Sequence, residues 1–117
     1  MKTEQLHELI YQMLETERGG IQVYTTALEC VINEDLKNEW EKYLEQTQNH
    51  EQIVLQLMEN LDLEPEEDTP GRQVIRHIGE SLVKAMQIAQ QSGPPEAAEL
   101  VACECIVQAE TKDHLNW

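Results

Sequence analysis

Three short breaks divide the sequence into four long segments. The first break is Asn33-Glu34-Asp35, the second runs from Leu63 to Gly71, and the third is Ser92-Gly93-Pro94-Pro95. Such Gly-, Pro- and Asn-rich stretches end helices or connect them. In the second break, Thr69 and Pro70 have the order expected of an N-cap followed by the first helical residue.

The four segments between the breaks are all typical of helices. They lack alternating β-branched residues and are rich in Glu, Gln, Leu and Ala, which favour helical conformations. A chain of 117 residues builds one domain, so we expect residues 1–117 to form a single all-α domain. The expected helices, about four in number, cover residues 3–32, 35–62, 71–91 and 95–117, and they should form an antiparallel bundle.

The charge balance excludes several classes of function. The chain has 23 Asp and Glu against 8 Lys and Arg, a formal net charge of −15. A nucleic-acid partner requires clustered Lys and Arg, and an anionic membrane surface would repel such a chain. We therefore expect neither partner. Carboxylates do suit hard cations and iron, so a metal ion is the partner that this composition favours.

Nothing in the sequence indicates export from the cell. Acidic residues occur by Glu4, and no uninterrupted apolar run follows the N-terminus, so no signal peptide is expected. Cys30, Cys103 and Cys105 are odd in number and form no CxxC pair. We interpret them as three small buried thiols of a cytoplasmic protein.

One acidic residue interrupts the apolar stripe of the first segment at its middle. The stripe includes Leu6, Ile10, Met13, Gly20, Tyr24, Ala27 and Val31, and Glu17 fills the step between Met13 and Gly20. Glu17 lies about as far before the first break as His50 lies after it. In an antiparallel hairpin the two side chains would face each other at the same height. They could bind a metal, form a buried hydrogen-bonded pair, or leave Glu17 turned to solvent.

The last segment carries a second polar group on an apolar face. Glu110 and His114 share a face with Cys103, Ile106, Val107 and Trp117, and Asp113 follows Glu110 by three residues. A Glu with a His or Asp one turn later is how a helix presents two metal ligands. The alternative is a solvated polar turn that includes a His.

The first two segments resemble the ferritin-like superfamily, including rubrerythrins, bacterioferritin-type proteins and small bacterial relatives. The run from Glu17 to Leu28, with Tyr24 seven residues after the Glu, looks like the first helix of that family. The run from Tyr43 to Ile53 looks like its second helix, in which a Glu-x-x-His pair binds iron.

The resemblance implies a set of metal ligands with one gap. Glu17 takes the role of a lone Glu, His50 that of the second-helix His, and Glu110 that of a further Glu, with His114 or Asp113 beside it. Thr47 stands where the companion Glu of His50 is expected, and Glu51 is one turn beyond Thr47. The implied cofactor is iron, in a di-iron or degenerate site, or another divalent metal such as Mn or Zn.

Two classes of function follow from this pattern. The first is a cytoplasmic ferritin-like metal-binding bundle with iron oxidation or a peroxide or stress role; any enzyme of this kind would be a di-iron oxidoreductase. The second is a non-catalytic helical assembly module that has lost its metal site. Segment 71–91 could be a connecting helix, with one more helix following in relatives. The apolar face left by its absence would then be covered in a homodimer or higher homo-oligomer.

Overall fold

Four α-helices make up the chain in the computed structural model, which describes the backbone of residues 2–116 and the side chains of residues 2–111. They are α1 (Lys2–Cys30), α2 (Glu34–Asn60), α3 (Pro70–Ser92) and α4 (Pro95–Asn116). No strand occurs in residues 2–116. The expected all-α class is confirmed, and each expected boundary lies within two residues of the observed one.

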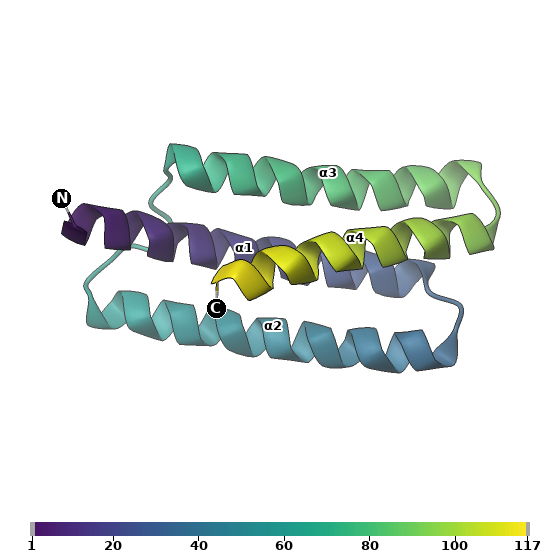
Figure 1. Ribbon diagram of the computed structural model, residues 1–117, viewed down its shortest axis with the longest axis horizontal. Helices are drawn as coiled ribbons and strands as arrows, with labels where there is room; N and C mark the ends of the chain where they lie inside the picture. The colour runs from purple at the N-terminus through teal and green to yellow at the C-terminus, as the bar shows by residue number, and fades with distance from the viewer. Residues whose placement is uncertain (1, 117) are drawn as a thin grey trace.

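The helices form an elongated bundle of 50 × 25 × 20 Å with α1 at its centre. Successive helices run in opposite directions, so α3 is parallel to α1 and α4 is parallel to α2 (Figure 1). α1 packs against each of the other three helices, and α3 also packs against α4. Within residues 2–116, the backbone of α2 approaches no helix except α1.

Local side-chain contacts set the helix ends. The Asn33 side chain accepts a hydrogen bond from the backbone N–H of Leu36 at 3.0 Å and caps α2. Thr69 caps α3 in the same way and Pro70 follows it, as the sequence predicts. After α2, Asp62 adopts a left-handed conformation with φ of 61°, which turns the chain away from the helix axis.

The core consists of two clusters along α1. The larger one packs the second half of α1 against α2, α3 and α4 and includes Val23, Ala27, Trp40, Met86 and Ala102. The smaller one lies between the first half of α1 and the end of α2 and contains Ile10, Tyr11, Leu14, Val54 and Met58. No helix in residues 2–116 has the combined length and apolar character that crossing a membrane requires.

The cysteines are unpaired thiols, as expected. Cys30 and Cys105 are buried, and Cys103 is partly buried. Burial raises the pKa of all three thiols above their usual range. A raised pKa disfavours the thiolate at neutral pH. Cys30 and Cys105 are buried packing residues, as expected, whereas Cys103 is only partly buried and differs from the expectation.

Candidate functional site

The acidic residue that interrupts the stripe of α1 lies against a histidine of α2. Glu17 is 1% exposed, and its Oε1 lies 3.2 Å from Nδ1 of His50. The His50 side chain is 31% exposed, so one side of the pair is reachable from solvent. The prediction that the two residues face each other is therefore confirmed. Glu17 does not turn out to solvent.

Close packing of α1 on α2 holds this pair in register. Thr47, one turn before His50, is buried, and its hydroxyl donates to the Tyr43 carbonyl at 2.8 Å. A Cβ added at Gly20 would stand 3.2 Å from the Thr47 methyl group, which is tighter than an ordinary contact. Gly20 thus allows the helices to approach closely at the level of the pair.

Glu110 of α4 is held by a tyrosine of α1. The Tyr24 hydroxyl donates to Oε1 of Glu110 at 2.5 Å. The Tyr24 and Tyr43 rings lie 6.0 Å apart, centre to centre. A hydrogen bond to the Glu39 carboxylate and burial raise the pKa of Tyr43, and the nearby charge of Glu110 adds to this shift. Tyr24 is two helical turns after Glu17, so Glu110 contacts α1 about two turns nearer to its C-terminal end than the Glu17–His50 pair.

The remaining predicted ligands fall into two groups. Glu51 lies about 100° around α2 from His50, and its Oε2 accepts a hydrogen bond from Nε of Arg18 at 3.3 Å. The side chains of Asp113 and His114 lie outside the described residues. Among the side chains of residues 2–111, no three His, Cys, Asp or Glu gather closely enough to hold a metal ion. The described part of the chain therefore brings together two of the predicted ligands, Glu17 and His50.

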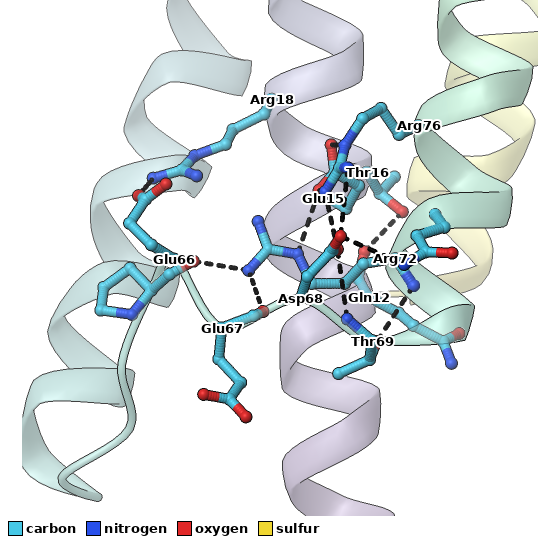
Figure 2. A network of polar contacts seen from close by, with 12 residues as sticks. Gln12, Glu15, Thr16, Arg18, Glu66, Glu67, Asp68, Thr69, Arg72 and Arg76 are labelled. Carbon is cyan, nitrogen blue, oxygen red and sulfur yellow. Dashed lines mark hydrogen bonds and ion pairs between the residues drawn. The ribbon is translucent and has the colours of Figure 1, made fainter.

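Sequence reasoning missed a second buried carboxylate, two residues before Glu17. Glu15 is 6% exposed, and its Oε1 accepts a hydrogen bond from Nε of Arg72 at 3.0 Å. Arg72 is itself 2% exposed. Nη2 of Arg76 donates to the same Oε1 at 3.1 Å (Figure 2). Two guanidinium groups of α3 thus bind one carboxylate of α1.

The same arginines attach the α2–α3 connection to the helices (Figure 2). Nη1 of Arg72 donates to the carbonyls of Pro65 and Glu67 at 2.5 and 3.0 Å. Arg76 donates to Asp68 at 2.9 Å, and this bond keeps the pKa of the Asp68 carboxyl below its usual range. The network therefore joins α1, α3 and residues 65–68.

A sequence signal for this network exists, although it is weak. The chain has only three arginines, Arg18, Arg72 and Arg76, and the last two are one turn apart at the start of α3. Arg72 lies on the inward face of α3, three residues before Ile75. A guanidinium at such a position needs a buried carboxylate partner. The sequence does not show which of 23 acidic residues supplies it.

An open groove of about 600 Å³ lies beside this network. Its lining comes from α1, α2 and α3 and includes Glu15, Arg18, Glu51, Arg76 and Glu80. Glu15 is bound by Arg76, and Glu51 is bound by Arg18. The charges that line the groove thus largely neutralise one another, and we assign no ligand to it.

Comparison of the chain with protein-family models, with curated proteins and with solved structures finds no match.

Proposed function

We propose that the protein is a metal-binding helical bundle of ferritin-like type, with its metal ion held at Glu17 and His50. The observation that carries the proposal is the buried Glu17 carboxylate beside an imidazole nitrogen. Burying a carboxylate in a helix stripe is costly unless a positive charge or a strong hydrogen-bond donor compensates. A divalent metal ion would supply that compensation.

The distance between the two donor atoms supports the proposal. Nδ1 of His50 and Oε1 of Glu17 are 3.2 Å apart. Two donors that each bind one ion at about 2.1 Å are separated by about 3.0–3.4 Å when the bond angle is about 90–109°. The pair thus has the spacing of two ligands of a common ion. Imidazole and carboxylate together suit iron, and also Mn or Zn.

Further ligands would come from α4. Glu110 is already turned toward α1, where Tyr24 holds its carboxylate. Residues 113 and 114 of the α4 backbone lie one turn beyond Glu110. Because α4 is antiparallel to α1, this turn is nearer to the level of Glu17 (Figure 1). Asp113 and His114 are therefore the residues we propose to complete the site, with Glu110.

The path of the chain is compatible with a ferritin-like arrangement. In folds of this type one long connection crosses the length of the bundle between the second and third core helices. Here α3 follows α2 in the chain and precedes α4. Because α3 runs along the bundle, the chain returns to the end where α2 began, and α4 is therefore parallel to α2 (Figure 1). In this proposal α1, α2 and α4 are core helices, and α3 is a helical crossover. Bound iron would supply reactivity toward oxygen or peroxide, consistent with iron oxidation or a peroxide or stress role.

Metal binding to matched variants tests the proposal. Purified protein is titrated anaerobically with ferrous iron by calorimetry, and its thermal unfolding is measured with and without the ion. We expect near-stoichiometric binding, with a stabilisation of about 2.7 kcal/mol at a hundredfold excess over Kd. Glu17→Gln and His50→Gln should each abolish both effects.

Glu51→Gln is the control, because it removes a carboxylate of the same helix that the structure pairs with Arg18. It should bind iron as the unchanged protein does. Binding well below stoichiometric, or binding that Glu17→Gln leaves intact, would refute the proposed site. Repeating the titration with Mn²⁺ and Zn²⁺ identifies the preferred metal.

A second candidate function, a non-catalytic assembly module, is favoured by a different observation. Eleven large apolar side chains of the described residues are exposed, several of them in groups. In this alternative the Glu17–His50 pair is a buried hydrogen bond without a metal. The iron titration separates the two candidates.

A further inference from the structure

One end of the bundle has an apolar face that none of the described helices covers. It consists of Leu6 and Leu9 of α1, Ile53 and Leu57 of α2, and Leu61 directly after α2, each between 38% and 54% exposed. We call these five residues the end face. Leu6 is eleven residues before Glu17, and Leu61 is eleven residues after His50. Since Glu17 contacts His50 and the helices are antiparallel, the two leucines lie at the same height.

The surroundings of the end face are poor in charge. The exposed residues of α2 beside it are amides: Asn49, Gln56 and Asn60. Glu51 is turned away to Arg18, and Glu59 lies on the far side of α2 from Leu57. In a chain with a net charge of −15, such a region is where a second acidic chain can approach without strong repulsion.

A second apolar feature lies on the outer side of α4. Leu100 and Val107 are 66% and 64% exposed, and the partly buried Cys103 lies between them at helical spacing. We call these three residues the α4 ridge. They face away from the buried side of α4, which carries Ala98, Ala102 and Cys105. Packing within the chain therefore does not explain the ridge.

The end face and the ridge form a step on the same side of the molecule. Figure 1 shows α4 in front of α1 along one part of the bundle, while the N-terminal part of α1 extends beyond the end of α4. Leu6 is eighteen residues, or five helical turns, before Tyr24, which contacts Glu110 of α4, so Leu6 and α4 lie on the same side of α1. The end face is therefore recessed by about one helix diameter, roughly 10 Å, relative to the ridge. A recess and a projection on one side, at different positions along the axis, are self-complementary under a two-fold rotation.

We propose that the protein forms a two-fold symmetric homodimer in which the α4 ridge of each copy packs on the end face of the other. The broad side of the molecule measures 50 × 25 Å, so it has room for the roughly 800 Å² per partner that a typical stable interface buries. Each contact occurs twice, and both apolar features are covered in one arrangement. The inference does not depend on metal binding.

Sedimentation equilibrium of single variants tests the interface. The unchanged protein should be a dimer at micromolar concentration, and added salt should strengthen the dimer because it screens the net charge. Ile53→Lys in the end face and Val107→Glu in the ridge should each give monomers. Both positions are exposed, so circular dichroism and the melting temperature should stay close to those of the folded monomer. Gln48→Lys and Gln22→Glu, on the opposite side of the molecule, are matched charge controls and should remain dimeric.

Mixing the two variants tests the pairing of ridge with end face. In a mixed dimer, the lysine introduced into the end face of one copy would meet the glutamate introduced into the ridge of the other, and the second contact would be unchanged. Ile53→Lys and Val107→Glu should therefore be monomeric alone and form a one-to-one dimer when mixed. A monomeric unchanged protein would overturn the proposal. So would a dimer that both substitutions leave intact, or variants that fail to associate when mixed.

Discussion

The buried ion pair between α1 and α3 allows a quantitative prediction about stability. Arg72 and Glu15 have side chains 3% and 8% exposed, and Nε and Oε1 are 3.0 Å apart. Replacing Arg72 by Met preserves most of the side-chain volume and removes the charge and the hydrogen bonds. We expect the Glu15 carboxylate then to be buried with weaker compensation, and the carbonyls of Pro65 and Glu67 to lose a donor.

The magnitude follows from the geometry. Removing one partner of a buried ion pair costs about 3–5 kcal/mol. Arg76 still reaches Glu15 after the substitution, so we expect the lower end of this range, about 3 kcal/mol. A domain of this size unfolds with a free energy of about 5–15 kcal/mol. The loss should lower the melting temperature by roughly 12 °C, at roughly 4 °C per kcal/mol.

The free energy of unfolding is measured by urea titration, with circular dichroism as the signal, and Arg18→Met is the control. Arg18 also pairs with a carboxylate, Glu51 at 3.3 Å, but its side chain is 31% exposed. Its loss should cost only about 0–1 kcal/mol. The double variant Glu15→Leu/Arg72→Met should recover much of the loss, since no buried charge remains. If Arg72→Met costs no more than Arg18→Met, the buried network does not stabilise the bundle.

Three further predictions concern the helices and their ends. Gly19→Ala should raise the free energy of unfolding by about 0.5–1 kcal/mol, because Ala favours the helix and the added Cβ meets no atom within 4 Å. A lower free energy of unfolding, measured with urea, would contradict this. Thr69→Ala should lower it by about 1 kcal/mol, because the N-cap of α3 is lost, and an unchanged urea midpoint would contradict the assignment. Glu99 accepts hydrogen bonds from the backbone N–H groups of Asn33 and Ile32, which lower its pKa from 4.5. The hydrogen bonds of the ionised Glu99 carboxylate therefore stabilise the fold fully above about pH 4.5, and this stabilisation is lost as the pH falls through the lowered pKa. Glu99→Gln should have a lower melting temperature than the unchanged protein at pH 7, and the difference should shrink on acidification. A difference independent of pH would refute the assignment.

The helices and one residue pair could be predicted because both depend on local periodicity and on counting. The stripe through Met13, Glu17 and Gly20 fixes which face of α1 is inward. Equal distances from the Asn33 turn then bring Glu17 to the height of His50, as the structure confirms. The antiparallel packing of α1 and α2 also follows from the sequence, because a short turn makes the second helix run back along the first.

The second buried acid could not be predicted in this way. Glu15 is about 200° from Glu17 around α1, on a face that looks solvated in the sequence. It is buried because α3 packs there and presents Arg72, 57 residues further along the chain. Similarly, Glu51 looked like a candidate ligand near His50, yet its carboxylate is bound by Arg18, about 100° around α2 from His50. Both outcomes depend on which helix occupies each side of α1.

By itself, the sequence determined the four helices, their ends to within two residues, and the equal heights of Glu17 and His50, because helical periodicity, capping residues and short turns act over a few neighbouring residues. The tertiary structure alone decided the placement of α3 and α4 around α1. That placement determines which carboxylates are buried against arginine or tyrosine, and which apolar side chains stay exposed at the end face and on the α4 ridge. The physical reason is that burial of a surface residue depends on contacts between helices, and a single helical pattern does not specify its neighbours.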